Sequence, residues 1–286
     1  MRTSILLLSL LTLLTYCAPK PYSFEEAITF YSAFEGDGKA VIAKGDAAIY
    51  TTPNRREPDS TVVGMSANPN VELVAEGGLS GGALRFVKRG RPSIFYKCKE
   101  NMVYTPQDWS GAVSFWLKVD PAKDLAPGFT DPIQITDANY NDASIWVDFT
   151  KENPRSFRLG VIGDLAYWDP DTIGPNNNPE YEKRLVTVNE WPFTSTSWTH
   201  VFINYQNLGT PNGKGELFLN GVSQGAIDGL PDPFTWDLAN ANLYLGLGFI
   251  GYMDDLAVFN RPLTSAEITD LYGLAGGLKE QLKKYQ

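Results

Sequence analysis

Strict alternation of apolar and polar residues in the centre of the chain is the feature that most constrains its fold. In the segment 113–119 every second side chain, from Val113 to Val119, is apolar. The segments 133–136, 144–150 and 157–162 repeat this pattern. Successive side chains of a strand point to opposite faces of its sheet, so the spacing predicts strands with one face in a core. The sequence therefore indicates an all-β protein.

The opposite faces of these strands carry aromatic rings and planar polar groups: Trp116, Gln134, Trp146, Asp148 and Arg158. The C–H patches of a sugar stack on tryptophan while its hydroxyls bond to fixed polar groups, so this mixture predicts a carbohydrate-binding face. A structural alternative stays open. In it, Asp148 pairs with Arg158 across the strands, and the outer face packs under an insertion or the C-terminal tail.

A long loop that follows these strands extends the candidate site. Residues 165–181 are rich in proline and asparagine and place Trp168 beside Tyr167, with Tyr181 at the end of the loop. Long loops in compact domains are commonly functional or mobile. We therefore include Trp168 among the candidate ligand-binding residues.

Near the end of the chain, a strand-like segment passes directly into a helix signal. The segment 250–259 is rich in apolar residues and stops before Pro262. Thr264 and Glu267 have the spacing of a capping box, and Gly273 is placed to end the helix. The pattern predicts a closing strand followed by a short helix over 264–272.

This closing segment, with Asp254-Asp255 followed by Asn260-Arg261, resembles the end of a laminin G-like domain of the concanavalin A-like lectin/glucanase group. Three further motifs support the resemblance: Ala-Leu-x-Phe at 83–86, Trp-x-His-Val at 198–201 and Leu-Asn-Gly at 219–221. The resemblance covers roughly residues 28 to 272. The resemblance implies a two-sheet antiparallel β-sandwich of the jelly-roll type with a short C-terminal helix.

The same resemblance implies that the first strand lies beside the last, with a structural calcium ion where they meet. It places Asp37 and Asp254 as ligands, with main-chain oxygens near Glu35 and Gly36. An oxygen-rich site of this kind suits a hard cation. The alternative is that Asp37 only forms a turn and Asp254 caps or pairs.

Length and charge limit the remaining choices. With 286 residues, of which 43% are hydrophobic, one sandwich domain over 28–286 accounts for the chain, including a surface insertion at 51–79. The net charge of −9 argues against a nucleic-acid partner, because such binding needs clustered Lys and Arg.

The first residues carry targeting information. Met1-Arg2 followed by a short apolar run predicts a signal peptide over 1–18, and residues 19–27 form a linker. Leu14-Thr15-Tyr16-Cys17 resembles a bacterial lipobox, although Tyr16 is larger than that pattern prefers. Two outcomes stay open: a cell-surface lipoprotein with Cys17 as the lipidated N-terminus, or a secreted or periplasmic protein. In either case the protein is exported, and a membrane is reached only through the lipid.

We assign no catalytic residue. A retaining glucanase of this fold group carries Glu-x-Asp-x-Glu on one strand, whereas 144–150 offers one carboxylate, Asp148. His200 has no nearby nucleophile or metal ligand in the sequence and is interpreted as structural. The sequence thus favours a non-catalytic, exported module that binds a polysaccharide. An adhesive protein with a protein partner and a polysaccharide-cleaving glycosidase or lyase are the alternatives.

Overall fold

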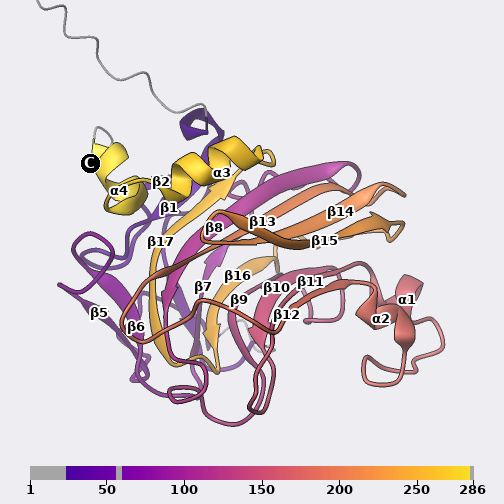
Figure 1. The fold of residues 1–286 in the computed structure, drawn as a ribbon, viewed down its shortest axis with the longest axis horizontal. Coiled ribbons are helices and arrows are strands. Elements are labelled where there is room, and N and C mark those ends of the chain that lie inside the picture. Colours follow the sequence, from indigo (N-terminus) through magenta and orange to yellow (C-terminus); the bar gives the residue numbers. More distant parts are fainter. Residues whose placement is uncertain (1–23, 56–59, 284–286) are drawn as a thin grey trace, which may run out of the picture.

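A computed structural model describes residues 24–55 and 60–283, and it consists of two antiparallel sheets packed face to face (Figure 1). The all-β sandwich that the sequence predicts is confirmed. We refer to the larger sheet as sheet A and to the other as sheet B.

Within the described residues, sheet A has nine strands. Its main path runs β15 (Val222–Leu230), β14 (Gly213–Leu219), β13 (Thr199–Leu208), β8 (Trp109–Lys118), β17 (Gly251–Phe259), β1 (Ile28–Ser32) and β2 (Ile42–Ala43), and β6 (Ala83–Phe86) pairs with β17 and with β5 (Val71–Val74). The first strand therefore pairs with the last, with Tyr31 opposite Ala257, as the resemblance implied.

Sheet B has eight strands in the described residues. Their order is β12 (Leu185–Val188), β11 (Phe157–Ile162), β10 (Ser144–Phe149), β9 (Thr130–Thr136), β16 (Asn242–Leu247), β7 (Ser93–Lys97), β3 (Tyr50–Thr52) and β4 (Val62–Val63). The insertion predicted at 51–79 thus supplies β4 to the edge of sheet B and β5 to sheet A.

The core lies between the two sheets and is made by the apolar side of each alternating strand. Phe115 of β8 and Val147 of β10 are fully buried there, together with Ile203 of β13. Burial of apolar area at about 25 cal/mol per Å² is the main favourable term in such a sandwich. The alternation thus predicts which side of each strand faces inward.

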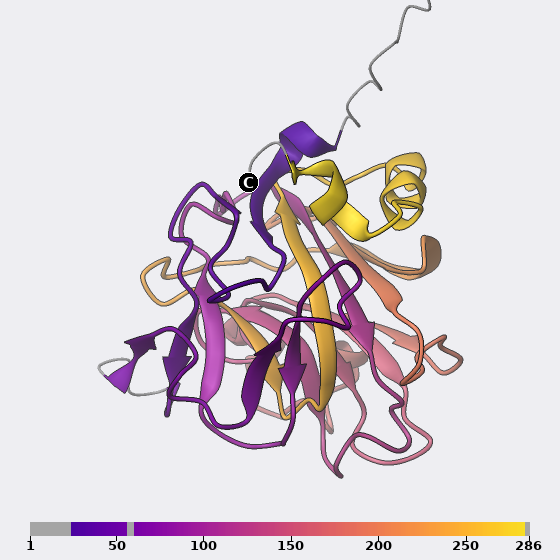
Figure 2. The same cartoon turned by 90° about the vertical axis from the view of Figure 1, so that its left-hand side faces the viewer.

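A second apolar cluster lies on the outer face of sheet A. Helices α3 (Ser265–Tyr272) and α4 (Gly277–Gln281) cover this face, and the 3-10 helix η1 (Glu25–Ala27) lies at its edge (Figures 1 and 2). Ile268 and Leu278 are fully buried against Phe202 of the sheet. The capping box of Thr264 and Glu267 is present, and Gly273 follows the last residue of α3, as predicted. No pattern in the sequence predicted α4.

Candidate functional site

The outer face of sheet B holds most of the predicted ligand-binding residues, because its strands bring them into register. Trp146 of β10 lies directly opposite Gln134 of β9, and Asp148 of β10 lies opposite Arg158 of β11. Directly opposed residues of antiparallel strands share a face. The structure therefore brings these four residues together.

Trp116 does not belong to this group, so the prediction of a single face holding all five residues is wrong. Trp116 lies on β8 of sheet A and is 6% exposed. Its ring stacks on Tyr272 of α3 with 5.8 Å between centroids and lies 4.8 Å from the ring of His200. Alternation distinguishes the outer side of a strand from its inner side, but it does not identify the sheet to which the strand belongs.

Asp148 and Arg158 form a bidentate ion pair. Arg158 Nε donates to Asp148 Oδ1 at 2.8 Å and Nη2 donates to Oδ2 at 2.5 Å. The guanidinium also lies 5.5 Å from the ring centre of Trp146 and 5.1 Å from that of Phe129. Because both carboxylate oxygens of Asp148 are occupied, the pair fixes the floor of the site and holds the indole.

A glycine determines how the indole of Trp146 lies. Trp146 Nε1 donates to the carbonyl oxygen of Tyr140 at 2.7 Å, which anchors the ring at one end. On the neighbouring strand, Gly160 lies directly opposite Trp146, and a Cβ there would come within 2.3 Å of the indole. Any larger residue at 160 would therefore displace the ring.

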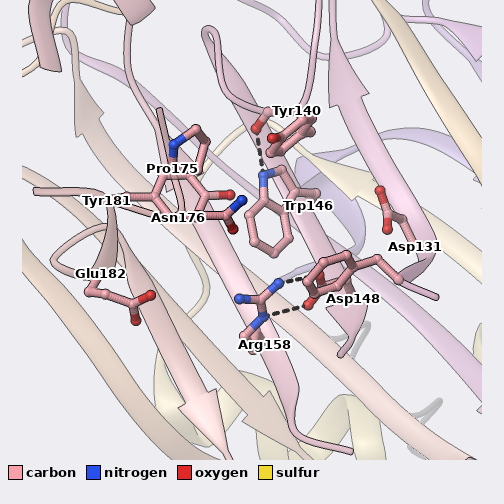
Figure 3. Close-up of a pocket in the computed structure, with 10 residues that line it drawn as sticks. Asp131, Tyr140, Trp146, Asp148, Arg158, Pro175, Asn176, Tyr181 and Glu182 are labelled. Atoms are coloured by element: carbon pink, nitrogen blue, oxygen red, sulfur yellow. Dashed lines mark hydrogen bonds and ion pairs between the residues drawn. The ribbon is translucent and has the colours of Figure 1, made fainter. Parts of the chain in front are cut away.

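These residues line a pocket of about 360 Å³ (Figure 3). Beside the ion pair and Trp146, it is lined by Phe129, Asp131, Tyr140, Pro175, Asn176, Tyr181 and Glu182. Trp146 is only 2% exposed, whereas Phe129 is 46% and Tyr140 is 40% exposed. The rings offered to a ligand are thus mainly those of the rim, which the alternation of the strands did not mark.

One wall of the pocket comes from the loop that the sequence singled out, through the short helix α2 (Pro179–Glu182). Asn178 caps this helix, since its side chain accepts from Glu180 N. Arg184 follows the helix, and its guanidinium pairs with the buried carboxylate of Asp232 at 2.6 and 2.7 Å. These bonds hold Tyr181 and Glu182 in the wall.

Trp168 lies behind this wall and does not line the pocket. It belongs to helix α1 (Leu165–Trp168), is 3% exposed and packs on Tyr181 with 5.4 Å between ring centres. Its Nε1 donates to the carbonyl oxygen of Asn141 at 3.0 Å. Its place in the site is therefore to support Tyr181.

Asp131 is a titratable residue of the site that the strand pattern did not predict. Burial raises the pKa of this carboxyl to about 8, and the charge of Asp148 adds to the shift. The guanidiniums of Arg55, Arg158 and Arg89 oppose it. At neutral pH the group is therefore largely protonated and able to donate a hydrogen bond.

Gln134 connects Asp131 to the middle of sheet B. When its amide oxygen and nitrogen are assigned so that both neighbours are satisfied, Nε2 donates to Asp131 Oδ2 and the amide oxygen accepts from Arg55 Nη2, both at 3.1 Å. Gln134 is 2% exposed. Its role here is to hold the carboxyl group of Asp131 and the guanidinium of Arg55.

Comparison with known proteins identifies the family. A model of the laminin G type, described as the concanavalin A-like lectin/glucanases superfamily, matches residues 99–269, which is more than half of the chain. The chain belongs to this family. A search of curated proteins gave no significant match.

Solved structures with the same fold include domain 4 of AbnA, a GH43 extracellular arabinanase from Geobacillus stearothermophilus, in complex with arabinotriose. It is 17% identical with a TM-score of 0.52, and the match covers 85% of this chain and 97% of that one. The botulinum neurotoxin serotype D ligand-binding domain, in complex with N-acetylneuraminic acid, is 12% identical with a TM-score of 0.54; the match covers 87% of this chain and 51% of that one. The likeness supports the jelly-roll fold of this laminin G-like domain.

The two calcium ligands implied by the family, Asp37 and Asp254, each accept hydrogen bonds from backbone amides in this laminin G-like domain. Asp37 is exposed, and its Oδ1 accepts from Lys39 N at 2.9 Å as in a turn. Asp254 is 3% exposed, and its two oxygens accept from Leu79 N and Asp255 N, both at 2.7 Å. Among the described residues no three His, Cys, Asp or Glu side chains are grouped as a metal site. Calcium binding by Asp37 and Asp254 stays a prediction.

Glu35, rather than Asp37, is the acidic neighbour of Asp254. Its Oε1 accepts from Gly82 N at 2.7 Å and from Lys279 Nζ at 2.5 Å. Burial raises the pKa of Asp254 to about 8, and the charges of Asp255 and Glu35 add to the shift. These contacts tie the glycine-rich turn at 77–82 to the closing strand and to α4.

Two further predictions concern the N-terminus and His200. Cys17 and the signal peptide lie outside the described residues. No helix in the described part is long and apolar enough to span a membrane. His200 is fully buried, with its Nε2 2.8 Å from Ser114 Oγ, and burial lowers its pKa to about 3. The ring is therefore neutral and packed within the covered face of sheet A.

Proposed function

We propose that this laminin G-like domain binds carbohydrate, and that the pocket on the outer face of sheet B is the binding site. The observation that carries the proposal is the make-up of this pocket. Half-exposed rings of Phe129 and Tyr140 stand at its rim, above a floor fixed by the Asp148–Arg158 pair. Flat apolar surface next to oriented polar groups is what a sugar ring requires.

The structural neighbours give loose support. The arabinanase domain was solved with arabinotriose and the neurotoxin domain with N-acetylneuraminic acid. At 17% and 12% identity they support a general carbohydrate-binding role without indicating which sugar.

The test is affinity electrophoresis in gels that contain a panel of plant and bacterial polysaccharides, with calorimetry on arabinotriose and N-acetylneuraminic acid as soluble probes. Phe129→Ala and Tyr140→Ala should each weaken retention about fivefold, since a stacked ring contributes about 1 kcal/mol. Tyr167→Ala is the matched control, because Tyr167 is 50% exposed and is not among the residues that line the pocket. Absence of retention, or variants that migrate like wild type, would overturn the proposal.

Polysaccharide cleavage is a second candidate, and Asp131 is the observation that favours it. A carboxyl with a pKa of about 8 in a pocket is suited to act as a general acid. Binding alone is better supported because the nearby carboxylate, Asp148, has both oxygens occupied by Arg158. Release of reducing ends or unsaturated products by wild type, lost in Asp131→Asn, would establish cleavage instead.

We also propose that the protein is exported, either as a lipoprotein or in a secreted or periplasmic form. The positively charged start and apolar run before Cys17 support this proposal. Labelling with radioactive palmitate in a bacterial host should mark the wild type and not Cys17→Ser if the protein is a lipoprotein. Recovery of the full-length chain in the cytoplasm would contradict export.

A further inference from the structure

A second pocket lies on sheet B, beyond Gln134 as seen from the first. It has a volume of about 280 Å³. Its lining includes Thr52, Arg55, Phe95, Asp137, Asn242 and Tyr244. These residues come from β3, β7 and β16 and from the segments beside them.

Strand register puts both pockets on the same face of the sheet. Gln134 lies opposite Trp146 on one side and opposite Tyr244 on the other, and Tyr244 lies opposite Phe95. The row therefore runs across β10, β9, β16 and β7. At about 4.8 Å between neighbouring strands, it spans about 14 Å. This distance is too long for one sugar and suits a chain of several.

The side chain of Arg55 lies between the two pockets. Its Nη2 donates to Gln134 at 3.1 Å, and its guanidinium carbon stands 4.4 Å from the ring centre of Tyr244. In the first pocket Arg158 lies in the same way against Trp146. Tyr244 is 6% and Trp146 is 2% exposed, so each pocket pairs an oriented guanidinium with a mostly buried ring at its floor.

The second pocket also offers an oriented amide. Asn242 Nδ2 donates to the carbonyl oxygen of Asn240 at 2.8 Å and to Tyr244 Oη at 3.2 Å. With its nitrogen engaged inside the protein, Asn242 offers its oxygen to a ligand. A sugar hydroxyl is the kind of donor that this oxygen accepts.

The charges of the two pockets indicate which kind of chain fits. The described residues that line them include the carboxyl groups of Asp131, Asp137, Asp148 and Glu182 and the guanidiniums of Arg55 and Arg158. Both guanidiniums are already engaged, with Gln134 and with Asp148. Asp148 balances the charge of Arg158, whereas Gln134 is neutral and leaves the charge of Arg55 in place. The carboxyl groups of Asp137 and Glu182 outnumber this one charge, and the whole chain carries −9, so the face does not attract an acidic polymer.

We propose that the two pockets form one binding face for an uncharged polysaccharide, which crosses the strands of sheet B and contacts Tyr244 and Asn242 at a second sugar position. The inference rests on the proposed carbohydrate binding. It adds both the class of ligand and the extent of the site.

The test compares neutral polysaccharides (arabinan, galactan, galactomannan and xyloglucan) with acidic ones (polygalacturonate, alginate and dextran sulfate) in affinity gels. Wild type should be retarded by at least one neutral polysaccharide and by none of the acidic ones. On that neutral polysaccharide, Tyr244→Ala should weaken binding about tenfold and Asn242→Ala about fivefold. Tyr244→Phe, which keeps the ring, should bind nearly as wild type does.

Matched controls come from sheet A and its hairpins. Tyr252→Ala removes a tyrosine of β17, and Asn212→Ala removes an exposed asparagine between β13 and β14. Both should bind as wild type does. Thermal melting shows which variants are folded, and Asn242→Ala serves if Tyr244→Ala does not fold.

The outcomes separate this inference from the proposed function. If Phe129→Ala loses binding while Asn242→Ala and a folded Tyr244→Ala keep it, the site is the first pocket alone and the inference is overturned. Stronger retention by an acidic polysaccharide overturns the assigned class. Retention by none of the polysaccharides overturns the proposed function and the inference together. Fragments of the retained polysaccharide give a second readout, since a disaccharide should be insensitive to Tyr244→Ala and a hexasaccharide sensitive.

Discussion

The outer faces of the two sheets start from the same sequence pattern and end in opposite environments. Trp116 on sheet A and Trp146 on sheet B both stand on the outer side of an alternating strand. Trp116 is covered by Tyr272 of α3, whereas Trp146 lines a pocket. The difference lies in what the rest of the chain places above each ring.

Helix α3, which covers the outer face of sheet A, is predicted by its capping box and its apolar stripe. A capped amphipathic helix such as α3 buries its apolar stripe against whatever sheet it reaches, and here Ile268 and Leu271 reach sheet A. Sheet B has the polar α2 region at one side instead, which meets the sheet through Tyr181 and Glu182. The pocket therefore lies on the outer face that the terminal helices leave uncovered.

The largest expected effect is on the covered face. Trp116→Ala should lower the free energy of unfolding by about 3–5 kcal/mol, because it removes a buried ring between His200 and Tyr272. Retention by polysaccharide should not change. Chemical denaturation measures the first effect and affinity gels the second. Trp198→Ala, a partly exposed tryptophan near the same sheet, should cost much less; loss of binding in folded Trp116→Ala would contradict the division between the faces.

The next largest effect is expected for a substitution beneath the pocket of sheet B, at Gly160. Gly160→Ala should cost about 1–3 kcal/mol, because its Cβ would overlap the indole of Trp146 at 2.3 Å. Displacement of the indole should also remove polysaccharide binding. Gly273→Ala is the control, since a Cβ there meets its nearest atom at 3.3 Å and the backbone is helical. A Gly160→Ala protein with wild-type affinity would show that the indole does not shape the pocket.

These contrasts show how far the sequence predicts the molecule. Alternation and the capping box are local signals, and they indicated the strands, the core side and α3 correctly. The grouping of Gln134, Trp146, Asp148 and Arg158 followed from the same period of two. The placement of Trp116 did not, because strand order depends on contacts between residues distant in the chain.

Local sequence patterns also did not predict which residues form the rim of the pocket. Phe129 and Asp131 lie at the start of β9, in a segment without a clean pattern, and only the fold carries them to Trp146. The raised pKa of Asp131 arises from burial and from Asp148, which is seventeen positions away in sequence (148 − 131). The spacing of residues in the sequence does not predict such a pKa shift.

A smaller effect concerns pH and two buried carboxyl groups of β17, those of Asp254 and Asp255. Burial raises the pKa of Asp254 to about 8 and that of Asp255 to about 6, above their ordinary value near 4. The folded protein therefore holds protons that the unfolded chain releases. This stabilisation is complete below pH 4 and is lost as pH rises through 6 and 8.

The melting temperature should accordingly fall by several degrees between pH 5 and pH 9, and the fall should be smaller in Asp254→Asn. Asp37→Asn, at an exposed carboxylate, should leave it unchanged. Differential scanning calorimetry across this range measures the slope. A melting temperature that rises with pH would mean that Asp254 is charged in the folded protein and balanced by a cation.

The smallest effect is expected for calcium. Because Asp37 is exposed and both oxygens of Asp254 are occupied by backbone amides, removal of calcium should leave the melting temperature unchanged. Melting in excess calcium and in excess chelator provides the measurement. A shift that disappears in Asp254→Asn would restore the calcium site implied by the family.

Gly160 has a consequence for how the proposed binding site is inherited. The strand pattern of β11 accepts valine or threonine at position 160 without any change to the apolar side that builds the core. Such a sequence would still match the family and still fold. A relative can therefore lose the pocket through one substitution that leaves every fold motif intact. A small residue across from the tryptophan is thus a better marker of shared binding than overall similarity.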